Sequence, residues 1–461
     1  MSLFVREGYF YKRFFSLTAA IALQNVIVFG VNLADNIMLG AYSETALSGV
    51  ALVNQIQFLL QMLIMGIGEG IIILSARFWG QRETGPIRQT ASIGVRLGLG
   101  VGFLVWAIVF FFPHQTLALF TSDEAVIGEG VRYLRIICFS YLFFSLTNIL
   151  ISVLRSVETV RIAFVVSFST LVINVCLNYV LIYGHFGAPR LGVRGAAIAT
   201  LTARIIETLI IVIYLKCIDK KLNVRLRDFA KFPKELFWQF LKVGSPVIAS
   251  NAIWGLAMAV QTAILGHLGS EAIAANSIAT TVFQILSVIV YGSASATSVL
   301  IGKTIGEGRM DMIRQYAKTL QVLYILLGLA TGVLLYCSKD AILAFYAVSP
   351  GAKELALQFI TVLSVTVCGT AYQMPALTGI VRSGGDTKFV LYNDTIFMWM
   401  IVLPSSALAA FVFDFSPTAV FICLKSDQIL KCFVAVVKVN RFKWIKTLNH
   451  EAQQKQLSKA F

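Results

Sequence analysis

The feature that most constrains this chain is a succession of long apolar stretches. A helix that crosses the hydrocarbon core of a bilayer needs about 20 predominantly apolar residues. About twelve stretches of that kind follow one another, at 14–39, 46–77, 89–112, 128–154, 160–184, 194–218, 239–266, 272–302, 315–337, 354–381, 388–412 and 417–439. With 57% hydrophobic and 13% charged residues, the chain has too few polar groups to cover a water-soluble globule. Because lipid cannot satisfy backbone polar groups and no segment alternates like a barrel strand, an all-α polytopic membrane protein is predicted.

The net charge of +15 is explained by membrane topology. Lys and Arg gather on alternate connections between the apolar stretches, whereas the opposite connections at 40–45, 113–127, 267–271 and 413–416 contain none. Two further opposite connections, 185–194 and 338–353, break the pattern with two basic residues each. The positive-inside rule predicts that both termini are cytoplasmic in a multi-pass protein of the cell (inner) membrane. No nucleic-acid partner is expected, because no basic, aromatic-rich soluble domain is present in the sequence.

The sequence contains no motif of an enzyme. It has no nucleophile elbow, no P-loop and no zinc-protease helix, and its seven cysteines are scattered without a C-x-x-C pair. We therefore expect neither catalysis nor a cysteine metal site. Without a nucleotide-binding motif, any uphill transport must be driven by an ion gradient.

A long polar interval at 216–242 divides the chain into two halves of six spans each. At an offset of 226 positions the second half aligns with the first, so that Gly66 matches Gly292 and Gly80 matches Gly306. Copies with an even number of spans share one orientation, which predicts two six-helix lobes related by a pseudo-twofold axis along the membrane normal. The predicted organisation is an N-lobe at 1–218, a cytoplasmic linker at 219–238, a C-lobe at 239–440 and a cytoplasmic tail at 441–461.

The two halves differ in their charged residues. The repeat pairs Asp35 with Gln261 and Glu69 with Ser295, so the ionisable groups in mid-span are expected in the first half alone. Asp35 stands in the apolar stretch 14–39, where a carboxylate is retained if a bundle interior or an aqueous cavity accepts it. A cap or a hydrogen bond to a neighbouring helix is the structural alternative.

The stretch 160–184 offers partners for that carboxylate. Asn174 and Asn178 are spaced i,i+4 and share one helix face. Their amides either join helices, as is common in membranes, or combine with Asp35 into the oxygen set that Na⁺ prefers.

Three further ionisable residues inside predicted spans are secondary candidates for the site. The sequence places Glu69 near the bilayer midplane. It is either a functional acid or a neutral acid that is hydrogen-bonded to a nearby backbone group. Arg204 and Glu207 are spaced i,i+3, which favours a structural ion pair over a functional one. Arg204 is the one mid-span cation that this interpretation recognises.

Six sequence motifs follow one another along the chain in the order "DNIMLG", "ARFWGQ", "NYVLIYG", "PRLGVRGAAIAT", "VGSPVIASNAIWG" and "GIVRSGGDT". In these motifs, and over essentially its whole length, the chain resembles the multidrug and toxic compound extrusion (MATE) family. This resemblance implies an antiporter coupled to H⁺ or Na⁺ that exports cationic amphipathic drugs or toxic metabolites. It also implies an N-lobe pocket whose matching positions here are Asp35, Asn174, Asn178 and Thr200.

The chain departs from the family pattern in ways that limit its expected ion sites. The carboxylates that some relatives have in spans 7 and 10 are missing, with Asn251 and Trp254 in span 7 instead, so ion coupling in the C-lobe is not expected. The expected partners are cationic small molecules and the lipid bilayer, the expected state is a monomer, and no cofactor is expected besides H⁺ or Na⁺ as coupling ion. The one candidate metal site is a Na⁺ site at Asp35.

Two other functions compete with this interpretation. A flippase for lipid-linked saccharides shares the lobed architecture, but it is expected to carry several cations in its central cavity. A membrane scaffold or receptor leaves Asp35 and the face of Asn174 and Asn178 unexplained.

Overall fold

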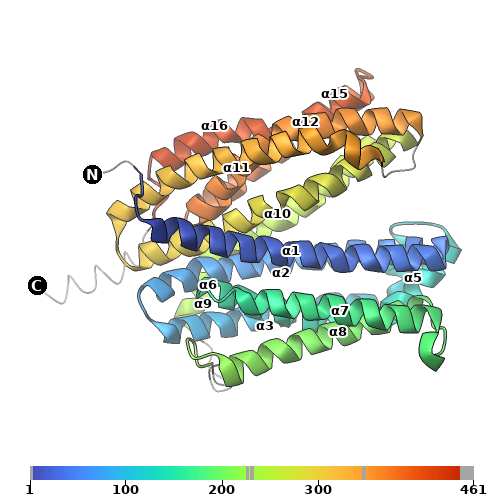
Figure 1. Ribbon diagram of the computed structural model, residues 1–461, viewed down its shortest axis with the longest axis horizontal. Coiled ribbons are helices and arrows are strands. Elements are labelled where there is room, and N and C mark those ends of the chain that lie inside the picture. Colours follow the sequence, from blue (N-terminus) through green and yellow to red (C-terminus); the bar gives the residue numbers. More distant parts are fainter. Residues whose placement is uncertain (1–3, 225–227, 229–232, 345–348, 447–461) are drawn as a thin grey trace, which may run out of the picture. The chain divides into compact units, whose positions relative to one another are not determined.

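The structure is a computed structural model that describes residues 4–224, 228, 233–344 and 349–446. Parts of the predicted linker (225–227 and 229–232) and of the predicted tail (447–461) lie outside these residues. Within the described residues every regular element is a helix (Figure 1). The predicted all-α class therefore agrees with the fold.

Among the described residues, the first half contains eight α-helices and two short helical segments. They are α1 (Gly8–Tyr42), α2 (Glu44–Gly80), α3 (Thr84–Phe111), α4 (Pro113–Ala118), α5 (Glu124–Ile137), α6 (Ser140–Ser156), α7 (Arg161–Tyr183), η1 (His185–Gly187), α8 (Val193–Ile213) and η2 (Tyr214–Ile218). Local chemistry sets several of these ends. Asp123 caps α5 by accepting from the backbone N–H groups of Ala125 and Val126, and Gly184 ends α7 at a φ of 77°.

The second half begins with long helices and continues with shorter, interrupted ones. They are α9 (Lys234–His267), α10 (Ser270–Gly306), α11 (Met310–Ala344), α12 (Pro350–Met374), η4 (Pro375–Val381), α13 (Thr387–Thr395), η5 (Ile396–Val402), α14 (Leu403–Phe411), α15 (Pro417–Lys425) and α16 (Asp427–Asn440). The segments η4 and η5 are π-helical turns that interrupt two of the predicted spans.

Among the described residues, ten helices are long and apolar enough to cross a membrane, and the bent pair α5 and α6 makes an eleventh candidate. The two helices of that pair meet at 55°. The twelfth predicted span, 417–439, is present as α15 and α16, which meet at Ser426. The charges of Lys425, Asp427 and Lys431 beside that junction lower its apolar character.

The chain divides into two compact units. The N-terminal unit comprises residues 19–75 and 82–237, and the C-terminal unit comprises residues 1–18, 76–81 and 238–461. The helices α1 and α2 therefore each contribute one end to the C-terminal unit. In the N-terminal unit α7 runs beside α8, and α6 packs between α3 and α8.

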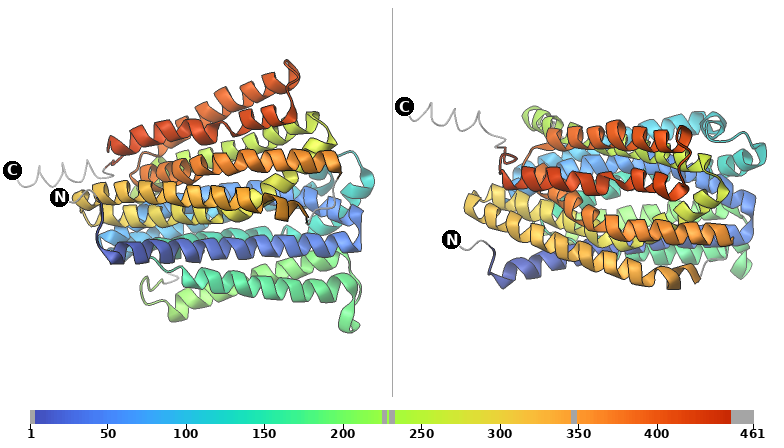
Figure 2. Two further views of the ribbon diagram at one scale, coloured as in Figure 1. Left: turned by 45° about the horizontal axis from the view of Figure 1, so that its top comes forward. Right: turned by 90° about the horizontal axis from the view of Figure 1, so that it is seen from above.

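In the C-terminal unit α12 is the central helix, packed against α10, α11 and α16 (Figure 2). Small residues bring α11 close to it. A Cβ on Gly332 would lie 2.5 Å from the carbonyl oxygen of Ser364, and one on Gly328 would lie 3.0 Å from that of Cys368. Such contacts between backbones are typical of helix packing in membranes, where apolar burial gives no advantage over lipid.

The sequence repeat is also present in the backbone. A Cβ on Gly80 would lie 2.0 Å from the carbonyl oxygen of Lys303, and one on Gly306 would lie 2.0 Å from that of Arg77. Gly80 matches Gly306 and Arg77 matches Lys303 at the offset of 226 positions, so α2 and α10 cross in a reciprocal way. This reciprocity is what a twofold relation between the two copies requires.

The turns that follow these helices repeat as well. Arg82 and Gly308, which match at the same offset, both have positive φ, at 61° and 71°. Glu158 and Gly385, which match at an offset of 227, do the same at 59° and 93°. The copies thus share unusual backbone conformations although their side chains differ.

Candidate functional site

The structure brings the four residues of the predicted N-lobe pocket together. The Asn178 amide group donates to Asp35 Oδ1 and also to Asn174 Oδ1 at 3.1 Å. Asn174 Nδ2 in turn donates to Thr200 Oγ1 at 3.1 Å. The carboxylate of α1 is therefore the end of a hydrogen-bonded chain that runs through α7 to α8.

Helix geometry explains this arrangement. The i,i+4 spacing puts both asparagines on one face of α7, and both are fully buried. The helix α8 approaches that face because Gly195 has no side chain: a Cβ there would lie 2.5 Å from the carbonyl oxygen of Leu181. Thr200 follows five residues later on α8, where its hydroxyl accepts from Asn174.

The surrounding charges leave the site anionic. Arg204 Nη1 lies 2.7 Å from Glu207 Oε2, and the Glu207 side chain is 5% exposed. Arg204 also lies 5.2 Å from the centre of the Phe144 ring and interacts favourably with Asp35. Because the pair of Arg204 and Glu207 is neutral together, the half-buried Asp35 adds one negative charge.

One buried oxygen of the site has no hydrogen bond. Asn178 Oδ1 is buried and accepts no hydrogen bond from any described residue. It belongs to the same side chain that holds Asp35, so a ligand at the carboxylate finds a second oxygen beside it. A hard cation or a donating N–H group suits such a pair of oxygens.

Sequence reasoning missed Tyr133 of α5. Its ring is buried, its hydroxyl hydrogen-bonds the Thr200 side chain, and it interacts with the charge of Asp35. With fifteen tyrosines in the chain, no local pattern marks this one. It reaches the site because α5 packs against α8, a tertiary contact that hydropathy does not predict.

Glu69 stands on a different helix from these four residues. It lies half-buried on α2, between Gly68 and Gly70. A Cβ on Gly68 would lie 2.4 Å from Ser152 Oγ of α6, so this part of α2 packs tightly against α6. Its neighbour Gly68 thus lies at a contact between α2 and α6, while Glu69 itself follows on the next position around the helix.

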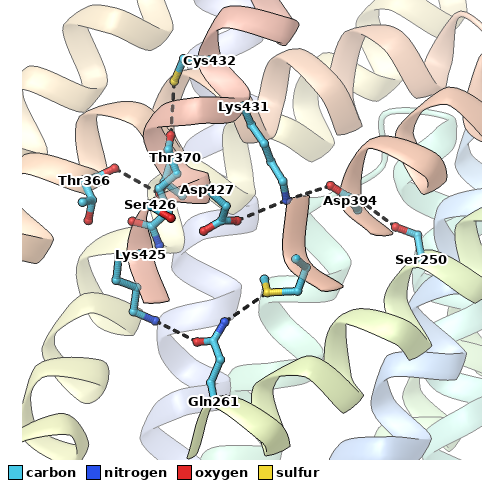
Figure 3. A network of polar contacts seen from close by, with 12 residues as sticks. Ser250, Gln261, Thr366, Thr370, Asp394, Lys425, Ser426, Asp427, Lys431 and Cys432 are labelled. Carbon is cyan, nitrogen blue, oxygen red and sulfur yellow. Dashed lines mark hydrogen bonds and ion pairs between the residues drawn. The ribbon is translucent and has the colours of Figure 1, made fainter. Parts of the chain in front are cut away.

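The expectation that mid-span charges belong to the first half alone is wrong. In the C-terminal unit, Lys431 Nζ of α16 lies 3.1 Å from Asp394 Oδ1 of α13 and 3.2 Å from Asp427 Oδ2 (Figure 3). Ser250 Oγ of α9 donates to Asp394 Oδ2 at 2.9 Å, and Arg382 Nη2 donates to Ser250 Oγ at 2.9 Å. The C-terminal unit thus holds a polar network of its own.

The counterpart of Asp35 in the repeat also has a charged neighbour. Gln261 Oε1 lies 3.5 Å from Lys425 Nζ, and its amide group contacts the sulfur of Met398 at 3.2 Å (Figure 3). Arg204 is therefore not the one cation within the predicted spans. The i,i+4 spacing of Asp427 and Lys431 was a visible signal, whereas Asp394 is too far along the chain for its partner to be read from the sequence.

These features define a class of protein: a multi-pass helical membrane protein built from two copies of one bundle, with a buried carboxylate and amide site in the first. A family model matches residues 20–180 and 246–408, one segment in each copy. The chain belongs to the MatE family, the multidrug and toxic compound extrusion transporters.

Known proteins resemble the chain over nearly its whole length. It is 25% identical to the uncharacterized transporter YisQ of Bacillus subtilis (strain 168) over 417 residues, 90% of each chain. It is also 25% identical to the probable multidrug resistance protein NorM of Listeria monocytogenes serotype 4b (strain F2365) over 444 residues, 95% of this chain and 96% of the relative. A crystal structure of MATE in complex with MaL6 matches with a TM-score of 0.84 at 19% identity, covering 93% of this chain and 95% of that chain. The predicted fold class is confirmed.

Proposed function

We propose that this protein is an antiporter that exports cationic amphipathic compounds in exchange for H⁺ or Na⁺, with Asp35 as the coupling carboxylate. The observation that carries the proposal is the chain from Asp35 through Asn178 and Asn174 to Thr200, with a buried amide oxygen that lacks a donor. The similarity to a probable multidrug resistance protein supports the drug as cargo.

Competition for one carboxylate couples the two movements. A proton, a Na⁺ ion and the ammonium group of a substrate each neutralise Asp35, so any of them replaces another without leaving a bare charge in the bundle. The Asn178 amide N–H holds the ionised carboxylate when it is empty. The occupant then biases which side of the membrane the site faces, because a ligand shifts such an equilibrium through its different affinity for the two states.

Both ions fit the donor set, in different ways. Na⁺ takes the Asp35 carboxylate together with the Asn178 amide oxygen, since hard cations prefer oxygen ligands. A proton needs the carboxylate alone. We further propose that the protein is a monomer in the inner membrane. Both of its termini lie in the cytoplasm in this proposal, which follows from the distribution of Lys and Arg.

The flippase alternative is not favoured by the charges found in the structure. A diphosphate group requires cations that are free to meet it. Arg204 is paired with Glu207, while Lys431 is paired with Asp394 and Asp427. Lys425, which lies beside Gln261, interacts favourably with the carboxylate of Asp427. Each of these cations is already compensated by a carboxylate.

The test is efflux of an aromatic cation such as ethidium from membrane vesicles, with the proton and sodium gradients collapsed separately. Asp35→Asn keeps the side-chain volume but cannot ionise, so gradient-driven efflux is expected to be abolished at equal protein abundance. The matched control is Asn36→Asp, which changes charge at the exposed neighbouring position and is expected to leave efflux unchanged. Wild-type efflux from the Asp35→Asn protein would refute the proposal.

A further inference from the structure

The polar network of the C-terminal unit is not used by the proposed coupling site. Its central group is the Lys431 ammonium, which lies between the carboxylates of Asp394 and Asp427 (Figure 3). The Lys431 side chain is 5% exposed, that of Asp427 is 10% exposed, and that of Asp394 is 24% exposed. Asp394 is therefore the member of this group that a ligand reaches most easily.

A small cavity lies beside Asp394. Its volume is about 10 Å³, and it is lined by Ser250, Ile253, Trp254, Asp394, Thr395, Met398 and Lys431. A cavity of roughly this size admits one group as large as a water molecule. The primary ammonium head of an amine is such a group, whereas a quaternary ammonium is several times larger.

The wall of the cavity combines charge and apolar surface. Asp394 supplies the negative charge, and Trp254, Met398 and Ile253 supply apolar side chains. The indole of Trp254 is 37% exposed and offers a face to an aromatic ring or to a cation. The lining thus suits a thin alkylammonium that carries an aromatic group at its other end.

The network can release Asp394 without leaving Lys431 unpaired. Lys431 contacts Asp427 one helical turn earlier on α16, at a distance close to that of its contact with Asp394. Arg382 Nη2 remains 3.8 Å from Asp394 Oδ2 on the other side. Because a buried carboxylate that loses one partner is costly, Asp394 would release Lys431 only to another cation.

We infer that Asp394 is a second binding carboxylate, selective for the primary ammonium group of aryl-alkylamines, and that the Lys431 ammonium is a tethered competitor for it. The ligand head enters the cavity and displaces the Lys431 ammonium from Asp394 Oδ1, and its aromatic group packs on the exposed face of Trp254. Lys431 keeps its ion pair with Asp427. The inference rests on the proposed handling of organic cations, and it adds a site in the other half of the chain with a different selectivity.

The test is equilibrium binding of dansylcadaverine, a fluorescent aromatic group on a primary alkylammonium, to the purified full-length protein. All variants carry Asp35→Asn, so that the coupling site contributes no carboxylate. In this background Asp394→Asn is expected to weaken binding by at least about tenfold, which corresponds to the loss of one charge interaction. Lys431→Met is expected to strengthen binding by about tenfold, since it removes the competitor.

A third variant keeps Lys431 in place and is expected to change binding in the direction opposite to that of Lys431→Met. Asp427→Asn removes the second partner of Lys431, which then holds Asp394 more firmly, so dansylcadaverine binding is expected to weaken several-fold. The matched control is Asp414→Asn, the same change at an exposed loop position, which is expected to leave binding unchanged. The variants are compared at equal monodispersity, so that a misfolded protein is recognised as such.

Four results would overturn the inference. They are unchanged binding in the Asp394→Asn protein, weaker or unchanged binding in the Lys431→Met protein, unchanged binding in the Asp427→Asn protein, and equal binding of the trimethylated quaternary form of the probe. The measurement involves no gradient and no transport, and Asp35 is neutral throughout. A negative result in this binding test would therefore count against the site at Asp394 and not against the proposed coupling at Asp35.

Discussion

At the scale of single residues, the two copies of the repeat differ in charge at one matching position. Asp35 is a carboxylate held by an amide, whereas Gln261 is an amide beside the Lys425 ammonium. The change from Asp to Gln replaces a carboxylate with a neutral amide on a side chain that is one methylene longer. The same helix position therefore attracts a cation in the first copy and an anion or a dipole in the second.

Asn178→Asp tests whether the amide face sets the choice of coupling ion. The new carboxylate lies beside Asp35, and two anionic groups at this spacing hold a cation more strongly than one. We expect efflux to keep more than about a tenth of the wild-type rate, a cost below about 1.4 kcal/mol in activation free energy. The dependence on a sodium gradient is expected to increase, as measured by efflux in vesicles with each gradient imposed alone.

The control for this prediction is the same exchange at Asn36, which is exposed one position after Asp35. If Asn36→Asp shifts the ion dependence as much as Asn178→Asp does, the effect belongs to the general charge of α1. If neither variant shifts it, the amides of α7 do not set the choice of ion.

At the scale of elements, the residues that follow α16 are fastened to the turn between η4 and α13. The backbone N–H of Lys446 donates to the Gly384 carbonyl at 2.7 Å, and the buried Trp444 packs on Gly384. Asp386 accepts from Lys446 Nζ at 2.6 Å and pairs with Lys438 Nζ at 2.7 Å. One carboxylate thus joins the end of α16, the segment after it and the turn.

The fastening is expected to respond to pH only in acid. Burial alone would raise the pKa of Asp386, but the hydrogen bonds and charges of Lys438 and Lys446 outweigh it, so the pKa lies below its ordinary value of 3.8. The stabilisation is therefore complete above pH 3.8 and is lost as the pH falls through the lowered pKa. Protection of the Lys446 amide against hydrogen exchange, corrected for intrinsic rates, should stay constant from pH 8 to pH 5.

Substitution separates this carboxylate from other causes of protection. Asp386→Asn is expected to reduce the protection of the Lys446 amide several-fold at pH 7, while Asp340→Asn, the same change at an exposed position of α11, should not. Full protection in the Asp386→Asn protein would mean that Trp444 and the hydrogen bond from Arg77 Nη1 to the Lys446 carbonyl hold the segment without the carboxylate.

Hydropathy predicts most of the spans but not how they are broken. The long apolar runs of α2 and α3 were visible because length and composition are enough to identify them. The bend between α5 and α6 and the π-helical turns of η4 and η5 were not, since they depend on packing against neighbouring helices. The pairing of Asp394 with Lys431 was missed for the same reason, because it joins two helices through their tertiary arrangement.

The predicted pocket was easier to recognise than the C-terminal network. A helix brings Asn174 and Asn178 to one face by geometry alone, and the family resemblance added Asp35 and Thr200. Tyr133 is marked neither by helical spacing relative to the other site residues nor by a family motif. It lies on α5, and the sequence does not predict how α5 and α6 are bent relative to each other. The residues found in advance are thus those that a helical period or a known motif relates to each other.

At the scale of the whole molecule, the repeat is preserved where two backbones touch. The helices α2 and α10 cross at Gly80 and Gly306, and Gly302 faces Ala76 at the same place, with 2.9 Å between a Cβ on Gly302 and that of Ala76. Ala76 and Gly302 also match at the offset of 226 positions. The side chains of the copies have diverged toward different charges, whereas the crossing has room for the smallest residues alone.

This crossing gives the last prediction. A Cβ at Gly80 or at Gly306 would meet a backbone carbonyl oxygen at 2.0 Å, and a helix carbonyl cannot rotate away, so α2 and α10 must separate. Gly80→Ala and Gly306→Ala are each expected to cost about 1–3 kcal/mol, as overpacking does, and by similar amounts because the two contacts are reciprocal. Once one substitution has separated the helices, the second meets a contact that is already open, so the double variant should lose less stability than the sum of the single losses.

Thermal unfolding of the purified protein measures the stability of the two single variants and of the double variant. Gly100→Ala is the control, since a Cβ at Gly100 has open space around it. Fully additive losses, or a loss at only one of the two positions, would show that the crossing is not the shared, symmetric contact of the two copies.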